Sequence, residues 1–156
     1  MGVSPGLSLS VPRLEKAFQS LQRQIHPDLF ALKTAREQQI ALGRSALANE
    51  AYHTLRDPLK RARYFLSVHG VDLEGVILED ASLLGEIMEE QEALEECRGD
   101  RGKIERKVGE YRQRVEQCLK EAERVVAEKG VGQEAAEQVM RAQYYDKLRK
   151  DALQME

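Results

Sequence analysis

Residues 11–28 read VPRLEKAFQSLQRQIHPD and set the architecture of the first half of the chain. Apolar side chains recur in this stretch at spacings of four, three and four, the period of one helix face, at Leu14, Phe18, Leu21 and Ile25. Ser10 is expected to cap this helix. Pro27 ends it, because the proline ring disfavours helical geometry at His26. We therefore predict a helix followed by a bend that projects His26 and Asp28.

The opposite face of the same helix is basic. Arg13, Lys16 and Arg23 fall at helical spacing, roughly opposite the apolar stripe. Residues 1–70 as a whole hold 10 Lys and Arg against 5 Asp and Glu, whereas residues 71–156 hold 14 against 22. Halves of opposite charge favour two faces with different partners, and the alternative is that both are solvated helix surfaces.

Two further helices are expected after the bend. A capping box at Thr34–Glu37 opens a helix that runs to about Arg56 and pairs with the first one as an antiparallel hairpin. Its expected apolar face comprises Ile40, Leu47, Ala51 and Leu55. Asp57 and Pro58 then supply the cap and the first residue of a third helix, which is expected to end at Gly70.

Residues 71–80 mix glycine and acids with valine and leucine, and they predict a linker between two domains, residues 1–70 and residues 81–156. Beyond the linker, three apolar patterns predict three helices. They comprise Leu83, Leu84, Ile87, Met88 and Leu94; then Ile104, Val108, Tyr111, Val115, Cys118, Ala122 and Val125; and last Ala136, Val139, Met140, Tyr144 and Leu148. Short connections between these helices predict an antiparallel three-helix bundle, so the whole chain is expected to be all-α.

Composition excludes several classes of protein. The chain has 156 residues, of which 42% are apolar and 33% charged, and no apolar run approaches the roughly 18 residues of a membrane span. Cys97 and Cys118 cannot form a disulfide framework, so a reducing compartment is expected. His26, His53 and His69 lack partners at ligand spacing, so no metal or cofactor is expected. No nucleophile, base and orienting group can be placed together, which argues against an enzyme.

Two stretches of the chain resemble the HscB-type J-domain co-chaperones of iron-sulfur cluster assembly. They are LQRQIHPD (residues 21–28) and NEAYHTLRDPLKRA (residues 49–62), with weaker similarity in residues 86–96 and 144–148. The resemblance implies a J-domain that stimulates ATP hydrolysis by a 70-kDa heat-shock chaperone, followed by a bundle that holds the iron-sulfur cluster scaffold protein. It also implies that the chain is not itself an enzyme, and that it works in the mitochondrial matrix or, alternatively, in the bacterial cytoplasm.

The resemblance also assigns candidate site residues. The family's chaperone contact falls on His26, Pro27 and Asp28, with Arg13, Lys16 and Arg23 as supports on the basic face. The family's scaffold contact falls on Leu84, Met88, Glu89, Glu92, Glu96 and Tyr144. Helical spacing agrees, because Leu84, Met88 and Glu92 step by four along one face. An apolar strip edged with acid suits a basic-rimmed partner.

Three positions depart from the family's pattern. Leu29 stands where relatives usually carry a cation, Gly85 where a larger apolar residue is common, and Glu90 where a leucine is common. The family's short aromatic first helix is expected to be missing, either because the N-terminus is truncated or because this J-domain lacks that helix. A scaffold-binding adaptor without chaperone activation and a general J-domain co-chaperone are the alternative functions. Nucleic-acid binding through the basic half is disfavoured, because no stacking aromatics interleave the cations.

Overall fold

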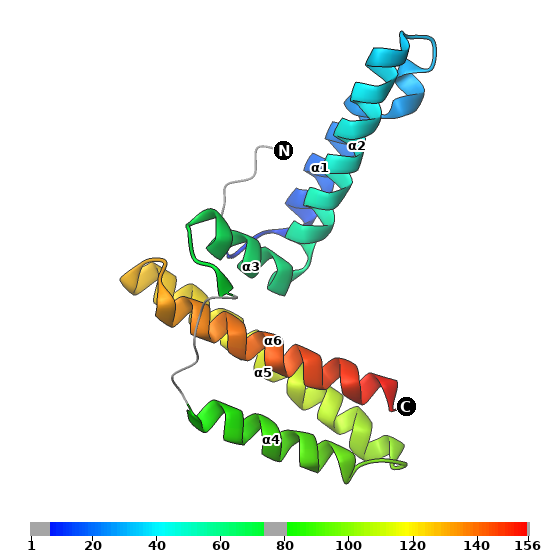
Figure 1. Ribbon diagram of the computed structural model, residues 1–156. Helices are drawn as coiled ribbons and strands as arrows, with labels where there is room; N and C mark the ends of the chain where they lie inside the picture. Colours follow the sequence, from blue (N-terminus) through cyan, green and yellow to red (C-terminus); the bar gives the residue numbers. More distant parts are fainter. Residues whose placement is uncertain (1–6, 74–80, 156) are drawn as a thin grey trace. The chain divides into compact units, whose positions relative to one another are not determined.

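A computed structural model describes residues 7–73 and 81–155 of the chain (Figure 1). The elements in chain order are α1 (Val11–Ile25), a short 3₁₀ helix η1 (Pro27–Phe30), α2 (Ala35–Arg56), α3 (Pro58–Val68), α4 (Ala81–Glu95), α5 (Arg101–Lys129) and α6 (Gln133–Gln154). Every regular element among the described residues is helical, so the all-α prediction is confirmed. The sequence pattern did not predict η1.

The chain divides into two compact units, Met1–Phe65 and Leu66–Glu156, which we call the hairpin unit and the bundle unit. Most of the expected linker, residues 74–80, lies outside the described residues. Residues 1–6, which bear on the expected absence of a first helix, lie outside them as well. No helix of the described part is long and apolar enough to span a membrane.

In the hairpin unit, α1 and α2 lie side by side and antiparallel (Figure 1). Leu14 of α1 is fully buried, as the helical stripe predicted. The face of α2 that is buried differs from the prediction: it carries Ala41, Ser45 and Ala48, whereas Ile40 and Leu47 are exposed. Small side chains on α2 let the two helices approach closely, so that the larger residues of α1 fill the space between them. The prediction of Ile40 and Leu47 as buried residues is therefore wrong.

Directional contacts also join the two helices of the hairpin. The Gln22 side-chain amide donates a hydrogen bond of 2.9 Å to Asn49 Oδ1, and the Ser45 hydroxyl donates one of 3.4 Å to Gln22 Oε1. Phe18 stacks on Tyr52 with ring centroids 4.3 Å apart. Such contacts fix how far one helix is slid along the other, which apolar packing alone specifies less tightly.

The helix ends follow the predicted signals with one exception. The Thr34 and Glu37 side chains form the capping box of α2. The carboxylate of Asp57 accepts hydrogen bonds of 2.9 Å from the backbone N–H groups of Leu59 and Lys60 at the start of α3. The Ser10 side chain makes no capping hydrogen bond to α1, contrary to the prediction. A proline in the first turn has no N–H to donate, which removes one of the groups such a cap serves.

In the bundle unit, α5 and α6 form a long antiparallel pair and α4 lies alongside them (Figure 1). The predicted four-three pattern of α5 is its buried face: its fully buried members are Ile104, Tyr111, Ala122 and Val125. The buried residues of α6 are several alanines together with the larger Val139, Tyr145 and Leu148. From α4, Leu83, Ile87 and Leu94 are buried. The alternation of spacings thus marks the side of α5 that packs against its neighbours.

Candidate functional site

The bend after α1 is closed by its own side chains. His26 ends α1 in an extended conformation, with φ −58° and ψ 133°, and Pro27 opens η1. The His26 Nδ1 accepts a hydrogen bond of 3.3 Å from the backbone N–H of Asp28 and lies 3.4 Å from Asp28 Oδ2. The proline ring and this local bond hold the turn in one shape.

The polar side chains of the bend face solvent. The side chain of His26 is 52% exposed and that of Asp28 is 90% exposed. The structure therefore shows the two features that the sequence predicted here, an interrupted helix and a projecting imidazole and carboxylate. An exposed carboxylate beside a rigid proline is well placed to meet a cation on another molecule.

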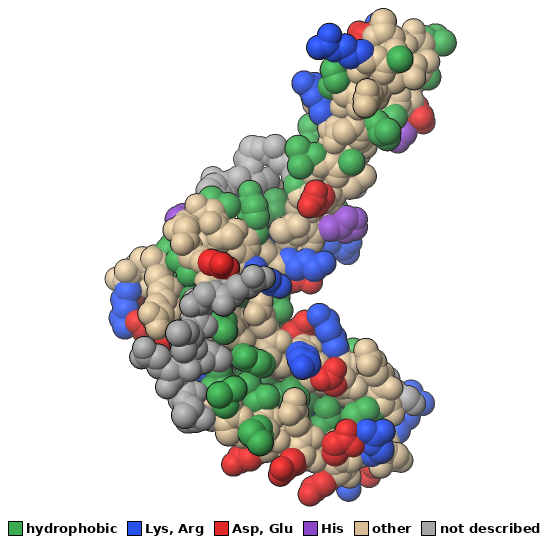
Figure 2. Space-filling view, viewed as in Figure 1, with side chains coloured by type: hydrophobic (Ala, Val, Ile, Leu, Met, Phe, Trp, Pro, Cys, Tyr) green, Lys and Arg blue, Asp and Glu red, His purple; other side chains and the backbone are tan. Residues whose placement is uncertain are grey.

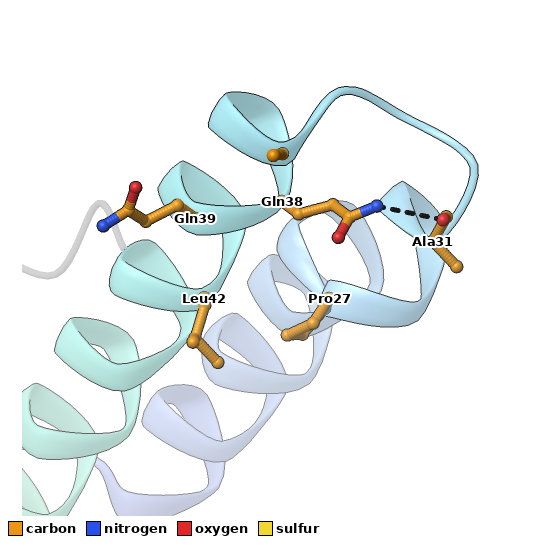
Figure 3. A pocket seen from close by; sticks show the side chains of 6 residues that line it. Pro27, Ala31, Gln38, Gln39 and Leu42 are labelled. Atoms are coloured by element: carbon orange, nitrogen blue, oxygen red, sulfur yellow. Dashed lines mark hydrogen bonds between the residues drawn. The ribbon is translucent and has the colours of Figure 1, made fainter.

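A shallow hollow of about 370 Å³ lies beside the bend, where η1 faces the first turns of α2 (Figure 3). It is lined by Pro27, Ala31, Ala35, Gln38, Gln39 and Leu42. The side-chain amide of Gln38 donates hydrogen bonds of 3.0 Å to the carbonyl oxygens of Ala31 and Lys33, which ties the loop to α2. The hollow is a surface depression of the same end of the hairpin that carries the bend.

The cations predicted to support the bend lie on α1. Arg13, Lys16 and Arg23 are all exposed, and Arg23 stands in the last turn next to the bend. Sequence reasoning missed the apolar character of the loop itself: Leu29 is 58% exposed and Leu32 is fully exposed. Figure 2 shows hydrophobic side chains among charged ones at this end of the hairpin. The signal was the sequence Leu29-Phe30-Ala31-Leu32 itself, an apolar run within the loop.

The second candidate surface lies on α4. Leu84 and Met88 are 51% and 63% exposed, although both are large apolar side chains. The carboxylates of Glu89 and Glu92 are exposed beside them, and Glu96 is exposed in the turn that follows α4. Figure 2 shows acidic side chains along the outer edge of α4, with hydrophobic ones beside them. We call these five residues the α4 face; Tyr144, the sixth predicted residue, is half-buried on α6.

The inner side of α4 carries a cluster of polar contacts that the sequence did not predict. Glu86 accepts hydrogen bonds from the Arg114 guanidinium of α5 and from the Tyr145 hydroxyl of α6, the latter at 2.5 Å. Arg114 also donates a hydrogen bond of 2.9 Å to the Tyr145 hydroxyl and lies over the Tyr145 ring. Contacts between helices far apart in sequence leave no local pattern to find.

Glu90 belongs to the same inner side and not to the α4 face. Its carboxylate pairs with Lys107 at 2.7 Å and accepts a hydrogen bond of 3.1 Å from the Tyr111 hydroxyl, and its side chain is only 17% exposed. The departure from the family's pattern at this position therefore does not interrupt the outer strip. Gly85 has open space where a side chain would begin, so its lack of one leaves the strip thinner there.

Burial and pairing change the pKa values of this inner cluster. Burial raises the pKa of Glu90, but Lys107, Tyr111 and Arg114 together lower it by more, so the net pKa lies below its ordinary value. Burial and the hydrogen bond to Glu86 raise the pKa of Tyr145 to about 12. At neutral pH the tyrosine is thus a neutral donor to a charged carboxylate, a strong form of hydrogen bond.

No group of three or more histidine, cysteine or acidic side chains in the described part of the chain is arranged to hold a metal ion. The two cysteines are free thiols, Cys97 buried and Cys118 half-buried. Burial raises the pKa of Cys118 and so disfavours the reactive thiolate. The bend and the α4 face both expose their side chains to solvent.

Comparison with known proteins gives matches to one kind of protein, HscB. Residues 79–152 match the family model of the HSCB C-terminal oligomerisation domain. Over 98% of its length the chain is similar to the chaperone HscB from Vibrio cholerae, covering 92% of that chain with 28% identity and a TM-score of 0.83. It is also similar in fold to the human co-chaperone protein HscB, with 24% identity and a TM-score of 0.90 over 99% of this chain and 78% of that one.

An all-α chain with an exposed His-Pro-Asp bend and a C-terminal bundle of this kind is a co-chaperone. The match of the C-terminal domain model and the likeness to the bacterial HscB along nearly the whole chain agree, and together they support an HscB-type co-chaperone.

Proposed function

We propose that this chain stimulates ATP hydrolysis by a 70-kDa heat-shock chaperone through the bend at His26, Pro27 and Asp28. The observation that carries the proposal is the exposed, locally closed His-Pro-Asp turn in a chain of HscB type. The chaperone supplies the catalytic groups and the nucleotide, so the chain itself hydrolyses nothing. Its place of action is the mitochondrial matrix or, alternatively, the bacterial cytoplasm.

The carboxylate of Asp28 is the acting group of the bend. It is 90% exposed, so it can approach a cation at the chaperone's domain junction and compete with that cation's resting partner. Such competition favours one conformation of the chaperone over another. The size of the effect is limited by the difference in affinity for the two conformations, and moving an equilibrium from 1:99 to 99:1 takes about 5.5 kcal/mol.

The cations of α1 serve the approach of the chaperone. Arg13, Lys16 and Arg23 share one exposed face that leads to the bend. Clustered charges of one sign raise the rate of association with an oppositely charged surface, and salt screens the effect. We expect these three residues to contribute to the association rate, and Asp28 to the conformational change.

The α4 face, together with Tyr144, holds the iron-sulfur cluster scaffold protein. Leu84 and Met88 supply exposed apolar area that water covers when the scaffold is absent. The acids Glu89, Glu92 and Glu96 edge that area and select a partner with a basic rim. By holding the scaffold while the bend engages the chaperone, one chain delivers the first to the second.

A single-turnover ATPase assay with the chaperone tests the proposal. Wild type is expected to raise the hydrolysis rate, and Asp28→Asn is expected to lose at least nine-tenths of that effect, because a neutral amide cannot replace a carboxylate against a cation. The matched control is Glu50→Gln, an exposed acid of α2 outside the bend, which is expected to behave as wild type.

Adding the scaffold protein extends the same assay. Met88→Ala is expected to leave stimulation without scaffold intact and to weaken scaffold binding about tenfold. Stimulation at background in wild type, with scaffold binding intact, would select a scaffold-binding adaptor instead. Stimulation without any scaffold binding would select a general J-domain co-chaperone.

A further inference from the structure

The inner side of α4 carries a set of contacts with no role in the function proposed above. Glu86, Arg114 and Tyr145 come from α4, α5 and α6, and each of the three side chains contacts the other two. We call this trio the clasp. Figure 1 shows the three helices that it joins. One turn further along α4, Glu90 makes a second anchor on Lys107 and Tyr111 of α5.

Apolar packing alone leaves the position of α4 loosely specified. Leu83, Ile87 and Leu94 decide which side of α4 turns towards the other two helices, because they are buried. Burial of apolar area depends little on direction, so it tolerates small slides and rotations of the helix. Hydrogen bonds to charged groups need defined distances and angles. The clasp therefore supplies the directional part of the α4 docking.

The clasp lies next to the surface proposed to bind the scaffold. Leu84 and Met88 flank Glu86 two residues away on either side, and they are exposed while the Glu86 carboxylate contacts α5 and α6. On α6, the buried Tyr145 of the clasp directly follows Tyr144 in sequence. Fixing Glu86 to Tyr145 thus fixes the α4 face relative to Tyr144.

We propose that Glu86, Arg114 and Tyr145 are positioning residues for scaffold binding, which hold the α4 face and Tyr144 in the arrangement that one partner contacts at once. The inference rests on the proposed function for the identity of the partner. It adds that a binding surface built from two helices also depends on the third helix, whose Arg114 contacts both Glu86 and Tyr145. None of the three side chains needs to touch the scaffold.

Tyr145→Phe tests the clasp with the smallest change. It removes one hydroxyl and keeps the aromatic ring that is packed in the core. Scaffold affinity, measured by titration calorimetry on the full chain, is expected to fall about tenfold or more, the loss that corresponds to about one hydrogen bond to a charged group. The matched control is Tyr52→Phe in the hairpin unit, which removes a hydroxyl that bonds to no described residue.

A second series separates positioning from simple stability. Glu86→Gln keeps an acceptor oxygen for Tyr145, whereas Glu86→Ala removes it, so affinity is expected to fall in the order wild type, Gln, Ala. Amide hydrogen exchange is the structural readout. In Tyr145→Phe, exchange is expected to speed up along α4 and to stay unchanged along α5 and α6, which share a long packed interface of their own.

The outcomes distinguish the clasp from the function on which it rests. If wild type does not bind the scaffold, the proposed function is refuted. In that case, faster hydrogen exchange confined to α4 in Tyr145→Phe still supports the clasp as a device that positions α4. If Tyr145→Phe binds the scaffold with the same affinity as wild type and shows the same hydrogen exchange along α4, the clasp is overturned. Faster exchange spread equally over α4, α5 and α6 would overturn it too, because the hydroxyl would then serve only general stability.

Discussion

The imidazole of His26 lies over the start of η1, with Nδ1 3.3 Å from the backbone nitrogen of Asp28 and 3.4 Å from its carboxylate oxygen Oδ2. One residue of the His-Pro-Asp bend therefore shapes the backbone on which another is presented. The residues of the bend therefore have different roles: His26 and Pro27 set the shape of the turn, and Asp28 presents an exposed negative charge to solvent.

The first prediction separates these roles. His26→Ala removes the acceptor for the Asp28 N–H, so residues 27–30 are expected to become more mobile, and stimulation of the chaperone is expected to fall. Asp28→Ala leaves both the acceptor and the backbone N–H in place, so it is expected to lose stimulation without loosening the turn. Backbone NMR order parameters of residues 27–30 report the difference. Equal order parameters in both variants would show that His26 does not shape the turn.

The second prediction concerns the face of α2 that packs on α1. Ala48 is buried and Leu47, its neighbour, is 67% exposed. Ala48→Leu is expected to destabilise the hairpin unit by about 1–3 kcal/mol, because three extra carbons must enter a close helix contact. Leu47→Ala is expected to change stability by less than about 0.5 kcal/mol. Chemical denaturation of both variants measures the two changes in stability. If Leu47→Ala were more destabilising than Ala48→Leu, the buried face of α2 would be the one first expected from sequence.

The third prediction uses two glycines of opposite conformation. Gly85 lies inside α4 with open space around a built Cβ, so Gly85→Ala is expected to stabilise the bundle unit by about 0.5–1 kcal/mol. Gly70, after α3, has φ of +80°, and the backbone N–H of Val71 bonds there to the Leu66 carbonyl at 3.0 Å. Gly70→Ala is expected to destabilise by about 1 kcal/mol, since a side chain disfavours that φ. Thermal unfolding measures the change in stability of each variant. Changes of the same sign in both variants would contradict this assignment.

The fourth prediction is a dependence of stability on pH. The net pKa of Glu90 lies below its model-peptide value of 4.5, so folding favours the charged form. Its contribution is present above about pH 4.5 and is lost as the pH falls through the lower pKa of the folded state. Asp146, paired with Arg149 and Lys150, acts in the same direction, although burial opposes it.

Denaturation at pH 7 and at pH 3.5 tests this dependence. Glu90→Gln is expected to be less stable than wild type at pH 7 and to lose less stability on acidification. Glu89→Gln, on the exposed side of α4, is the matched control and is expected to follow wild type at both pH values. Parallel losses in wild type and Glu90→Gln would exclude Glu90 as a source of acid sensitivity.

Helix positions were predictable because their signals are local. The apolar period from Leu14, the capping box at Thr34 and the cap at Asp57 each involve residues within four positions of one another. The bend at Pro27 is equally local, since proline acts on the residue before it. The exposed His-Pro-Asp turn could therefore be predicted from local signals, whereas its candidate role as a chaperone contact came from the resemblance to a family.

The buried face of α2 and the exposed leucines of the loop were not predictable in this way. A period of four and three fits both Ile40 with Leu47 and Ala41 with Ala48, and hydrophobicity favours the wrong pair. The correct pair is decided by how closely α1 approaches, a distance between two segments and not a property of either one. The contacts of Glu90 were not predictable for a similar reason: its neighbours in sequence lie on the outer face, whereas its partners lie on α5.

The amino-acid order alone determined where the chain is helical, where it bends and which charged groups the bend presents, because backbone sterics and hydrogen bonds between near neighbours act before any helix meets another. Only the tertiary structure decided that Glu86, Arg114 and Tyr145 meet on the inner side of α4, while the α4 face lies exposed on its outer side. Those residues are up to 59 positions apart, and their contact depends on the packing of three whole helices.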